Sequence, residues 1–208
     1  QVSPWMANGN LLDHVRDNPR VDRLKLLTEM VSGLEYLHSK GIVDINLRGS
    51  NVLISERSTV KLSDFGHSTF VDDGDGKTAS GTSAVQWMAP ELMRRVTRTG
   101  TATSDVWSFG TLCYALLVGE RHFEDVDVES VIRMPHTCSI PERTERISES
   151  PNLTFDVWEL MQQYWSAHPS SRPSTTFVKN KLLGIRNTPA GNLNDVSISS
   201  SNYRLQED

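Results

Sequence analysis

The segment from Asp44 to Asn51, DINLRGSN, gathers polar side chains of the types that suit chemistry at a phosphate group. Asp64 follows later in the chain, directly before Phe-Gly. Mg²⁺ is a hard cation that prefers oxygen ligands, which the Asn51 amide and the Asp64 carboxylate supply. A cation such as Arg48 stabilises the charge on a phosphoryl group during its transfer. These residues therefore predict a magnesium and phosphate site.

Each of these residues also has a purely structural interpretation. Asp64 can form a turn before Phe-Gly, and Asn51 can cap a loop through its amide. Arg48 can be a solvated surface arginine. For Asp105 the structural interpretation is the stronger one, because we expect it to cap the helix that it opens and to hold the backbone of the 44–51 segment.

Two predicted elements bring Asn51 and Asp64 together. Apolar residues at helical spacing predict a helix over residues 21–38, and Gly41 marks its end. NVLI (51–54) and VKLS (60–63) then predict two short strands joined as a hairpin. Asn51 begins the first strand and Asp64 follows the second, so the hairpin places their side chains near each other.

The remaining segments are mostly helical. Further helices are predicted from Ser104 to about Val118, over residues 154–166 and over residues 174–183. Residues 71–84 are polar and rich in glycine, which predicts a surface loop. The apolar period fades from Gly184, so residues 184–208 predict a flexible tail. The fold class is therefore mainly α with a small β-hairpin.

The composition excludes several classes of protein. The chain has 208 residues, 37% of them hydrophobic and 23% charged, which fits one packed domain with a tail. The net charge of -5 argues against a nucleic-acid partner, because such proteins usually carry a basic face. No apolar stretch is long enough to span a membrane, and no signal-peptide pattern is visible. With two cysteines in no metal-ligand spacing, the sequence predicts a cytoplasmic protein.

Five motifs in order resemble the C-terminal lobe of a protein kinase, closest to the tyrosine-kinase-like group. LRGSN, ending at Asn51, resembles the second half of the catalytic loop HRDLxxxN, and DFG begins at Asp64. MAPE ends at Glu91, and SDVWSFG (104–110) resembles the opening of the central buried helix. HPSSRP contains Arg172, which resembles the late arginine that pairs with that glutamate. Five ordered motifs are far more specific than one DFG alone.

The resemblance implies a protein kinase-like fold over residues 1–183, with ATP and Mg²⁺ as cofactors. Asn51 and Asp64 are then the metal ligands. Met6 lies on the hinge segment whose backbone contacts adenine, and Leu53 belongs to the floor of the adenine pocket. The sequence contains no glycine-rich loop, strand lysine or helix glutamate before the hinge. We therefore expect the hinge and the C-terminal lobe only, with the N-terminal lobe absent and the chain alone inactive or nearly so.

The catalytic loop departs from the family pattern at three positions. Asn46 stands where the family has its catalytic aspartate, with Arg48 two positions later, and an amide cannot accept the proton of a hydroxyl substrate. Losing a general base typically costs about 100- to 10,000-fold in rate. Asp44 stands at the histidine position, where a buried carboxylate is costly unless it is paired or protonated. Ile45 replaces the arginine that senses a phosphate on the activation loop in many kinases, so no such switch is expected.

Three hypotheses follow for the function. The favoured one is a degenerate kinase domain, or pseudokinase, that acts in signalling by binding protein partners or a complementary kinase N-lobe, with weak or no ATP and Mg²⁺ binding. The second is a low-activity protein kinase that transfers the γ-phosphate of ATP to Ser, Thr or Tyr hydroxyls once an N-lobe is supplied. The third is a nonfunctional kinase fragment.

Overall fold

A computed structural model describes residues 3–70, 82–93, 97, 99–119, 150 and 152–187, with the side chains of residues 82–84 excepted. Its α-helices are α1 (Leu11–Asp17), α2 (Arg23–Ser39), α3 (Pro90–Met93), α4 (Ala102–Val118), α7 (Phe155–Tyr164) and α8 (Thr175–Asn187). Its strands are β1 (Ile42–Val43), β2 (Val52–Ile54), β3 (Val60–Leu62) and β4 (Thr69–Phe70). Four 3₁₀ turns complete the described elements: η1 (Gly49–Asn51), η2 (Phe65–His67), η3 (Thr82–Trp87) and η5 (Pro169–Ser171).

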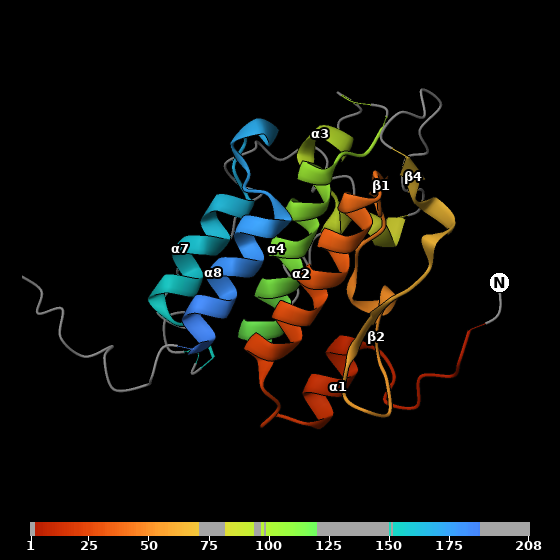
Figure 1. The fold of residues 1–208 in the computed structure, drawn as a ribbon, viewed down its shortest axis with the longest axis vertical. Helices are drawn as coiled ribbons and strands as arrows, with labels where there is room; N and C mark the ends of the chain where they lie inside the picture. Colours follow the sequence, from red (N-terminus) through yellow and green to blue (C-terminus); the bar gives the residue numbers. More distant parts are fainter. Residues whose placement is uncertain are drawn as a thin grey trace, which may run out of the picture.

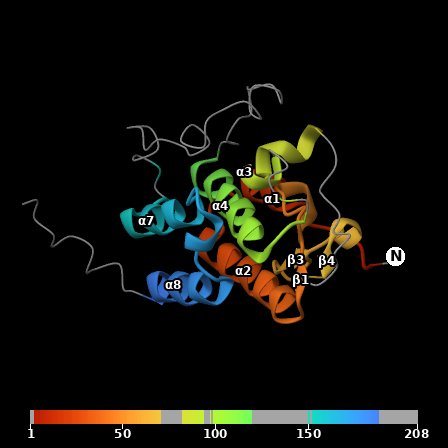
Figure 2. The same ribbon diagram turned by 90° about the horizontal axis from the view of Figure 1, so that it is seen from above.

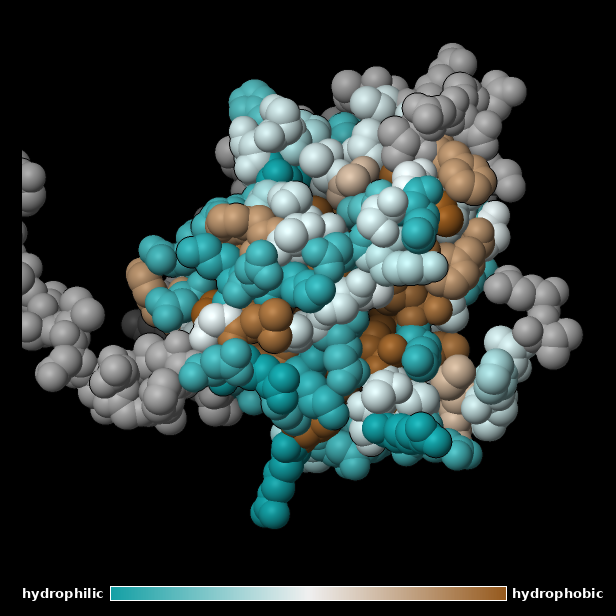
Figure 3. Space-filling model, viewed as in Figure 1, coloured by the Kyte–Doolittle hydropathy of each residue, from teal (hydrophilic) through white to brown (hydrophobic). Residues whose placement is uncertain are grey.

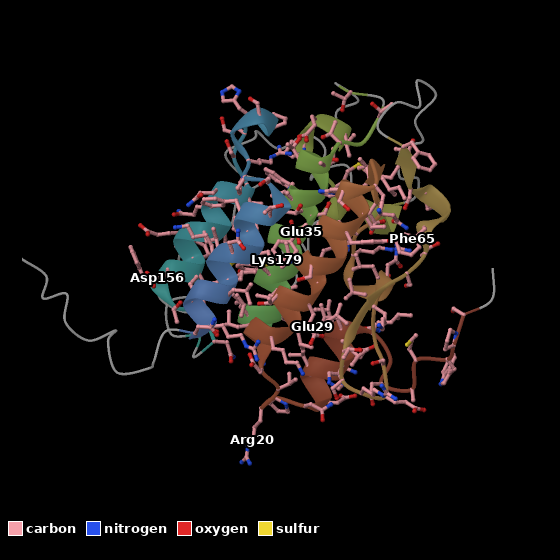
Figure 4. All side chains as sticks on the ribbon, in the orientation of Figure 1. Arg20, Glu29, Glu35, Phe65, Asp156 and Lys179 are labelled. Atoms are coloured by element: carbon pink, nitrogen blue, oxygen red, sulfur yellow. The ribbon has the colours of Figure 1, made fainter. Side chains whose placement is uncertain are left out.

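Helix α4 is the centre of the helical body, with α2, α7 and α8 around it (Figures 1 and 2). Every residue of α4 from Ser104 to Leu117 is buried, so this helix is enclosed by its neighbours on all sides. Gly110 lets α7 approach α4 closely, because a Cβ at that position would meet Trp165 and Tyr164 at 2.9 Å. The outer helices are joined by polar contacts as well, such as the 2.7 Å bond from Lys179 Nζ to Glu35 Oε2 (Figure 4).

The strands form two small antiparallel pairs on one side of α2 (Figure 2). Strand β2 pairs with β3 through Val52↔Leu62, Leu53↔Lys61 and Ile54↔Val60, which confirms the predicted hairpin. Strand β1 pairs with β4. Hydrophobic surface is visible on the side of α2 that carries the hairpin (Figure 3), where Val60 and Leu62 of β3 are only partly buried.

The start of α4 corrects a prediction. Ser104 and Asp105 do not open this helix, because it begins at Ala102 and Thr101 is its N-cap. The Thr101 hydroxyl accepts a 3.2 Å bond from the Ser104 amide, and the Ser104 hydroxyl accepts a 2.9 Å bond from the Thr101 amide. This reciprocal capping box satisfies the amides of Thr101 and Ser104 at the start of the helix. The Asp105 carboxylate is therefore not used as a cap.

The last helix also differs from its prediction. Helix α8 runs to Asn187, so it continues through Gly184, where the sequence predicted the tail to begin. A glycine costs a helix about 0.5–1 kcal/mol, which packing can offset. Here Ile185 packs against the core, and Arg186 Nε lies 3.2 Å from Asp22 Oδ2 of the α2 N-cap. Residues 188–208 of the predicted tail lie outside the described residues, as do residues 71–81 of the predicted loop.

Helices α2 and α7 agree with their predictions to within two residues at each end. Asp22 caps α2 by accepting a 2.8 Å bond from the Lys25 amide, and Thr154 caps α7 through the Val157 amide. None of the described helices combines the length and the apolar character that a membrane crossing requires.

Candidate functional site

The segment from Asp44 to Asn51 is the loop that joins β1 to β2, and it ends in the η1 turn. Asn51 is therefore fixed at the start of β2. Its carbonyl oxygen accepts bonds from the Ser63 amide at 2.9 Å and from the Ser63 hydroxyl at 2.8 Å. Because Ser63 precedes Asp64, the hairpin brings Asp64 beside Asn51, as the sequence predicted.

Three of the predicted site residues form one cluster. The Asn46 Nδ2 group donates to Asp64 Oδ2 at 3.2 Å, and Asn51 Nδ2 donates to the same oxygen at 3.4 Å. Asn51 Nδ2 also donates to the Asn46 carbonyl at 3.0 Å. Asp64 itself has a left-handed backbone, with φ at 61° and ψ at 52°, which is uncommon for a residue other than glycine. The turn at Phe65 lies at the edge of the molecule (Figure 4).

Arg48 and Ser50 lie on the other side of Asn51. The Asn51 Oδ1 atom accepts a 3.1 Å bond from the Ser50 hydroxyl and a 3.4 Å contact from Arg48 Nε. The amide of Asn51 is thus held at both ends, with its oxygen facing Arg48 and its nitrogen facing Asp64. Its orientation is set by these partners.

The residue types fit a magnesium ion, while the amides of Asn46 and Asn51 present donors, not oxygens, to Asp64 in this structure. Mg²⁺ requires oxygen ligands, and the cluster offers a carboxylate and an amide oxygen. However, the two N–H groups that reach Asp64 Oδ2 come from Asn46 and Asn51, so donors face the oxygen that a cation would share. The Asn51 oxygen faces the Ser50 and Arg48 donors instead. Within the described part of the chain, no group of three His, Cys, Asp or Glu side chains is placed to hold a metal.

Asp105 anchors the loop to the central helix, as the sequence predicted. Its Oδ2 accepts a 2.9 Å bond from the Asp44 amide, and its Oδ1 accepts a 2.9 Å bond from the Ile45 amide. His38 Nε2 of α2 lies 2.8 Å from the same Oδ2. These bonds to a fully buried carboxylate hold the loop against α4, because hydrogen bonds to charged groups are the stronger kind.

His38 is a residue that the sequence analysis missed. Besides its bond to Asp105, its Nδ1 lies 3.4 Å from the Thr175 hydroxyl at the start of α8. One imidazole therefore links α2, α4 and α8. No local pattern could have revealed this role, since the partners of His38 are far from it in sequence.

Asp44 is buried to 1% exposure, and its Oδ1 is without a hydrogen-bond partner among the described residues. Burial, together with the negative charge of Asp105 and more weakly that of Asp64, raises the pKa of Asp44 to about 7, against a bond from the Asn46 backbone that lowers it. A carboxyl in such surroundings favours its neutral form. This is the cost that the sequence predicted for a carboxylate at the histidine position.

Ile45 occupies a strained and closely packed position. Its φ is 55°, a left-handed value that a β-branched residue rarely adopts. The chain at Gly100 lies against its side chain, where an added Cβ would approach Ile45 Cγ2 to 1.7 Å. The side chain is buried to 6% exposure. Ile45 thus anchors the loop by packing.

Glu91 and Arg172 form the buried ion pair that the sequence predicted. The guanidinium holds the carboxylate with two bonds, Nη1 to Oε1 at 2.6 Å and Nη2 to Oε2 at 2.9 Å. Its remaining donors reach the Thr103 and Ser166 carbonyls, each at 3.0 Å. The guanidinium also lies 4.9 Å from the centre of the Trp107 ring. The pair therefore joins α3 to α4 and to the chain after α7.

Met6 and Leu53 lie on neighbouring segments. The Ile54 amide donates to the Gly9 carbonyl at 2.9 Å, and Asn10 forms a bridge with Leu53. The segment that carries Met6 therefore continues directly into the chain beside β2. Met6 and Leu53 are both half-buried. The segment predicted as the hinge therefore lies next to the residue predicted for the pocket floor.

Comparison with known proteins identifies relatives across nearly the whole chain. A family model for protein tyrosine and serine/threonine kinases matches residues 1–182. The tyrosine-protein kinase csk-1 of Caenorhabditis elegans is 31% identical over 193 residues, covering 90% of this chain and 34% of csk-1. Human receptor-interacting serine/threonine-protein kinase 3 is 37% identical over 185 residues, covering 83% of this chain and 35% of the relative.

Mitogen-activated protein kinase kinase kinase 13-B of Xenopus laevis is 35% identical over 175 residues, which cover 82% of this chain and 17% of the relative. The chain thus spans about a third or less of the length of these curated relatives. The ordered motifs, the hairpin that joins Asn51 to Asp64 and the family match agree with one another. The chain therefore belongs to the protein tyrosine and serine/threonine kinase family.

Proposed function

We propose that this kinase domain is degenerate and acts in signalling as a protein-binding module, with weak or no ATP and Mg²⁺ binding. The observation that carries the proposal is the 3.2 Å bond from Asn46 Nδ2 to Asp64 Oδ2. By the resemblance of the 46–51 segment to the catalytic loop, this amide donor stands where the family has its catalytic carboxylate, which supports the proposal.

The Asn46 amide has a consequence for proton transfer. A general base must accept the proton of the substrate hydroxyl, and an amide has no such capacity at neutral pH. Asp44 does not replace it, because its side chain is buried to 1% exposure and is not available to a substrate hydroxyl. In this proposal Asn46 can at best orient a hydroxyl group. Transfer of a phosphoryl group would then depend on positioning and charge alone.

The Asn46 amide also changes how strongly the cluster around Asp64 needs a bound cation. If position 46 carried an aspartate, its carboxylate would repel the Asp64 carboxylate at this separation. A metal ion between them would then hold the pair together best. Asn46 instead satisfies Asp64 Oδ2 with a hydrogen bond and removes one negative charge from the cluster. The cluster is therefore stable without Mg²⁺, and less is gained when the ion binds.

A second candidate function is a low-activity protein kinase, completed by an N-lobe. It is favoured by the placement of Arg48, Asn51 and Asp64 within one connected cluster. In that case the chain would transfer the γ-phosphate of ATP to a protein hydroxyl. Asn51 and Asp64 would hold Mg²⁺, and Arg48 would stabilise the transferred charge. The named relatives include tyrosine and serine/threonine kinases, so the acceptor stays open.

Thermal unfolding with ATP and Mg²⁺ distinguishes these candidates. A ligand at about 100 times its dissociation constant adds about 2.7 kcal/mol of stability, which corresponds to a rise of roughly 5–10 °C for a domain of this size. For the purified chain of 208 residues we expect a cooperative transition that millimolar ATP and Mg²⁺ raise by less than about 2 °C. Asp64→Ala serves as the control.

A larger, magnesium-dependent rise that Asp64→Ala abolishes would contradict weak binding and favour the kinase alternative. The absence of any cooperative transition would contradict a folded binding module and would favour the third hypothesis, a nonfunctional fragment.

Restoring the carboxylate tests the role of the amide directly. Asn46→Asp should lower the free energy of unfolding by about 1–3 kcal/mol in EDTA, because it removes a partly buried hydrogen bond to Asp64 and adds repulsion between two carboxylates. Mg²⁺ should restore part of this loss in the variant and change the wild-type protein little. The measurement is urea unfolding with and without Mg²⁺.

Gln162→Glu, at an exposed position of α7, is the matched control for an amide-to-carboxylate change. If Asn46→Asp has equal stability in EDTA and in Mg²⁺, the amide is not what makes the cluster independent of a cation.

A further inference from the structure

The segment before α1 contains Asn8-Gly9, the only asparagine-glycine pair in the chain. Asparagine is one of the chemically labile residues of proteins. The backbone nitrogen of the following residue can attack the asparagine side-chain carbonyl carbon, and glycine favours this attack because it has no side chain and an adaptable backbone. Asn8-Gly9 therefore has the residue types of a spontaneous deamidation site.

The fold requires a glycine at position 9 because of its backbone conformation. Gly9 has a φ of 67°, in the left-handed region that glycine adopts readily. Space does not demand glycine, since among the described residues no atom beyond its chain neighbours lies within 4 Å of where a Cβ would be. The Gly9 amide donates a 3.0 Å bond to the Met6 carbonyl and so closes a tight turn. The turn that needs glycine thus creates the labile pair.

Two further hydrogen bonds fix Asn8-Gly9 against the end of β2. Asn8 Nδ2 donates to the Ser55 carbonyl at 2.7 Å, and the Ile54 amide donates to the Gly9 carbonyl at 2.9 Å. Both reacting groups are therefore engaged in the folded protein, the Gly9 nitrogen with Met6 and the Asn8 side chain with Ser55. Attack requires these bonds to break, which is a local opening of the segment.

We propose that Asn8 is a deamidation site whose rate is set by the opening of residues 6–10 away from β2. In the open form the Gly9 nitrogen gives up its proton and forms a bond to Asn8 Cγ. The bond from Cγ to Nδ2 breaks, and the side-chain nitrogen leaves with that proton as ammonia. Water then opens the cyclic imide at one of its two carbonyls, which leaves aspartate or isoaspartate at position 8.

The products disfavour the closed arrangement. Aspartate replaces the Nδ2 donor with an oxygen that faces the Ser55 carbonyl oxygen, so an attraction becomes a repulsion. Isoaspartate also brings the side-chain carbon into the main chain, which displaces the Gly9 carbonyl from the Ile54 amide. Deamidation therefore releases the segment predicted as the hinge from β2, and the release is irreversible.

The first experiment compares the full chain with a synthetic peptide of residues 1–16 in the same mildly alkaline buffer. Trypsin releases this peptide from the chain, because Arg16 is the first lysine or arginine in the sequence. Mass spectrometry with fragmentation then follows the exchange of NH₂ for OH at each asparagine. Asn10 is the internal control, because the side chain of the following Leu11 obstructs the attack.

We expect Asn8 to deamidate about ten- to a hundredfold more slowly in the folded chain than in the peptide, because only the open fraction reacts. Unfolding the chain in urea should raise its rate to that of the peptide. Three results would overturn the proposal: equal rates in the folded chain and the peptide, reaction of Asn10 as fast as Asn8, or no Asn8 product in the chain after about ten half-lives of the peptide.

The second experiment tests the release of the segment with Asn8→Asp. The Ile54 amide should exchange its hydrogen about tenfold faster in this variant than in wild type, because the bond to Ser55 is lost. Asn180→Asp, at an exposed position of α8, is the matched control and should leave this exchange unchanged. Equal Ile54 exchange in the two variants would contradict the release.

Thermal unfolding of both variants separates a local release from a loss of fold. Neither experiment involves ATP, Mg²⁺ or a protein partner. The deamidation proposal goes beyond the proposed function, and the two can fail independently.

Discussion

Replacing Arg172 with alanine is expected to lower the free energy of unfolding by about 3–5 kcal/mol. The Arg172 side chain is fully buried and binds the nearly buried Glu91 carboxylate with two bonds of 2.6 and 2.9 Å. Removing it leaves a buried negative charge without compensation. It also leaves the Thr103 and Ser166 carbonyls without their donor, and it removes the cation from the face of Trp107.

Urea unfolding of both proteins, with the midpoint and slope fitted together, measures this loss. The matched control is Arg186→Ala, which breaks a partly exposed pair with Asp22 and should cost no more than about 1 kcal/mol. Arg172→Lys should recover only part of the loss, because an ammonium group cannot reproduce the paired geometry. A cost for Arg172→Ala no greater than that of Arg186→Ala would show that the pair does not hold the domain together.

The second large effect concerns the pH dependence of stability. The pKa of Asp44 rises from 3.8 to about 7 on folding, so the folded protein binds this proton more tightly than the unfolded chain does. The stabilisation that this bound proton gives the folded protein is therefore fully present below about pH 4, and it is lost as the pH rises through about 7. A pKa difference of about three units corresponds to up to about 4 kcal/mol in the free energy of unfolding. Asp44→Asn removes this titration and should flatten the curve.

The measurement is the free energy of unfolding of wild type and Asp44→Asn at intervals from about pH 4 to pH 8. We expect the difference between the two proteins to change by up to about 4 kcal/mol in favour of the variant. Asp156→Asn, at an exposed position on α7 (Figure 4), controls for the loss of one carboxylate. Parallel curves for wild type and Asp44→Asn would contradict a carboxyl that titrates near neutrality. The charged neighbours Asp105 and Asp64 remain in both proteins.

Local patterns in the sequence were enough to predict the elements that form the site. The short segments NVLI and VKLS predicted the β2–β3 hairpin, and this hairpin brings Asn51 and Asp64 into contact. Two helix ends differed from their predictions, one for a local reason and one for a tertiary reason. Thr101 starts α4 through a local capping box, whereas α8 passes through Gly184 because Ile185 packs against the core.

The sequence could not reveal groups whose roles depend on distant partners. His38 contributes through Asp105 and Thr175, which reach it from two other helices. Arg16 lies on α1 and Arg23 on α2, and nothing in their sequence positions relates the two residues. Only the fold shows that both line a cavity next to Gly49. The orientation of the Asn51 amide likewise depends on Ser50, Arg48 and Asp64 acting together.

The attachment of the loop to α4 has a consequence for how this sequence can change over evolutionary time. Asp105 holds the backbone of residues 44 and 45, and Ile45 packs against Gly100, so the shape of the loop is set by groups that perform no chemistry. Asn46 contributes a single side-chain bond of 3.2 Å. Position 46 can therefore change during evolution while the loop keeps its attachment to α4 and its shape.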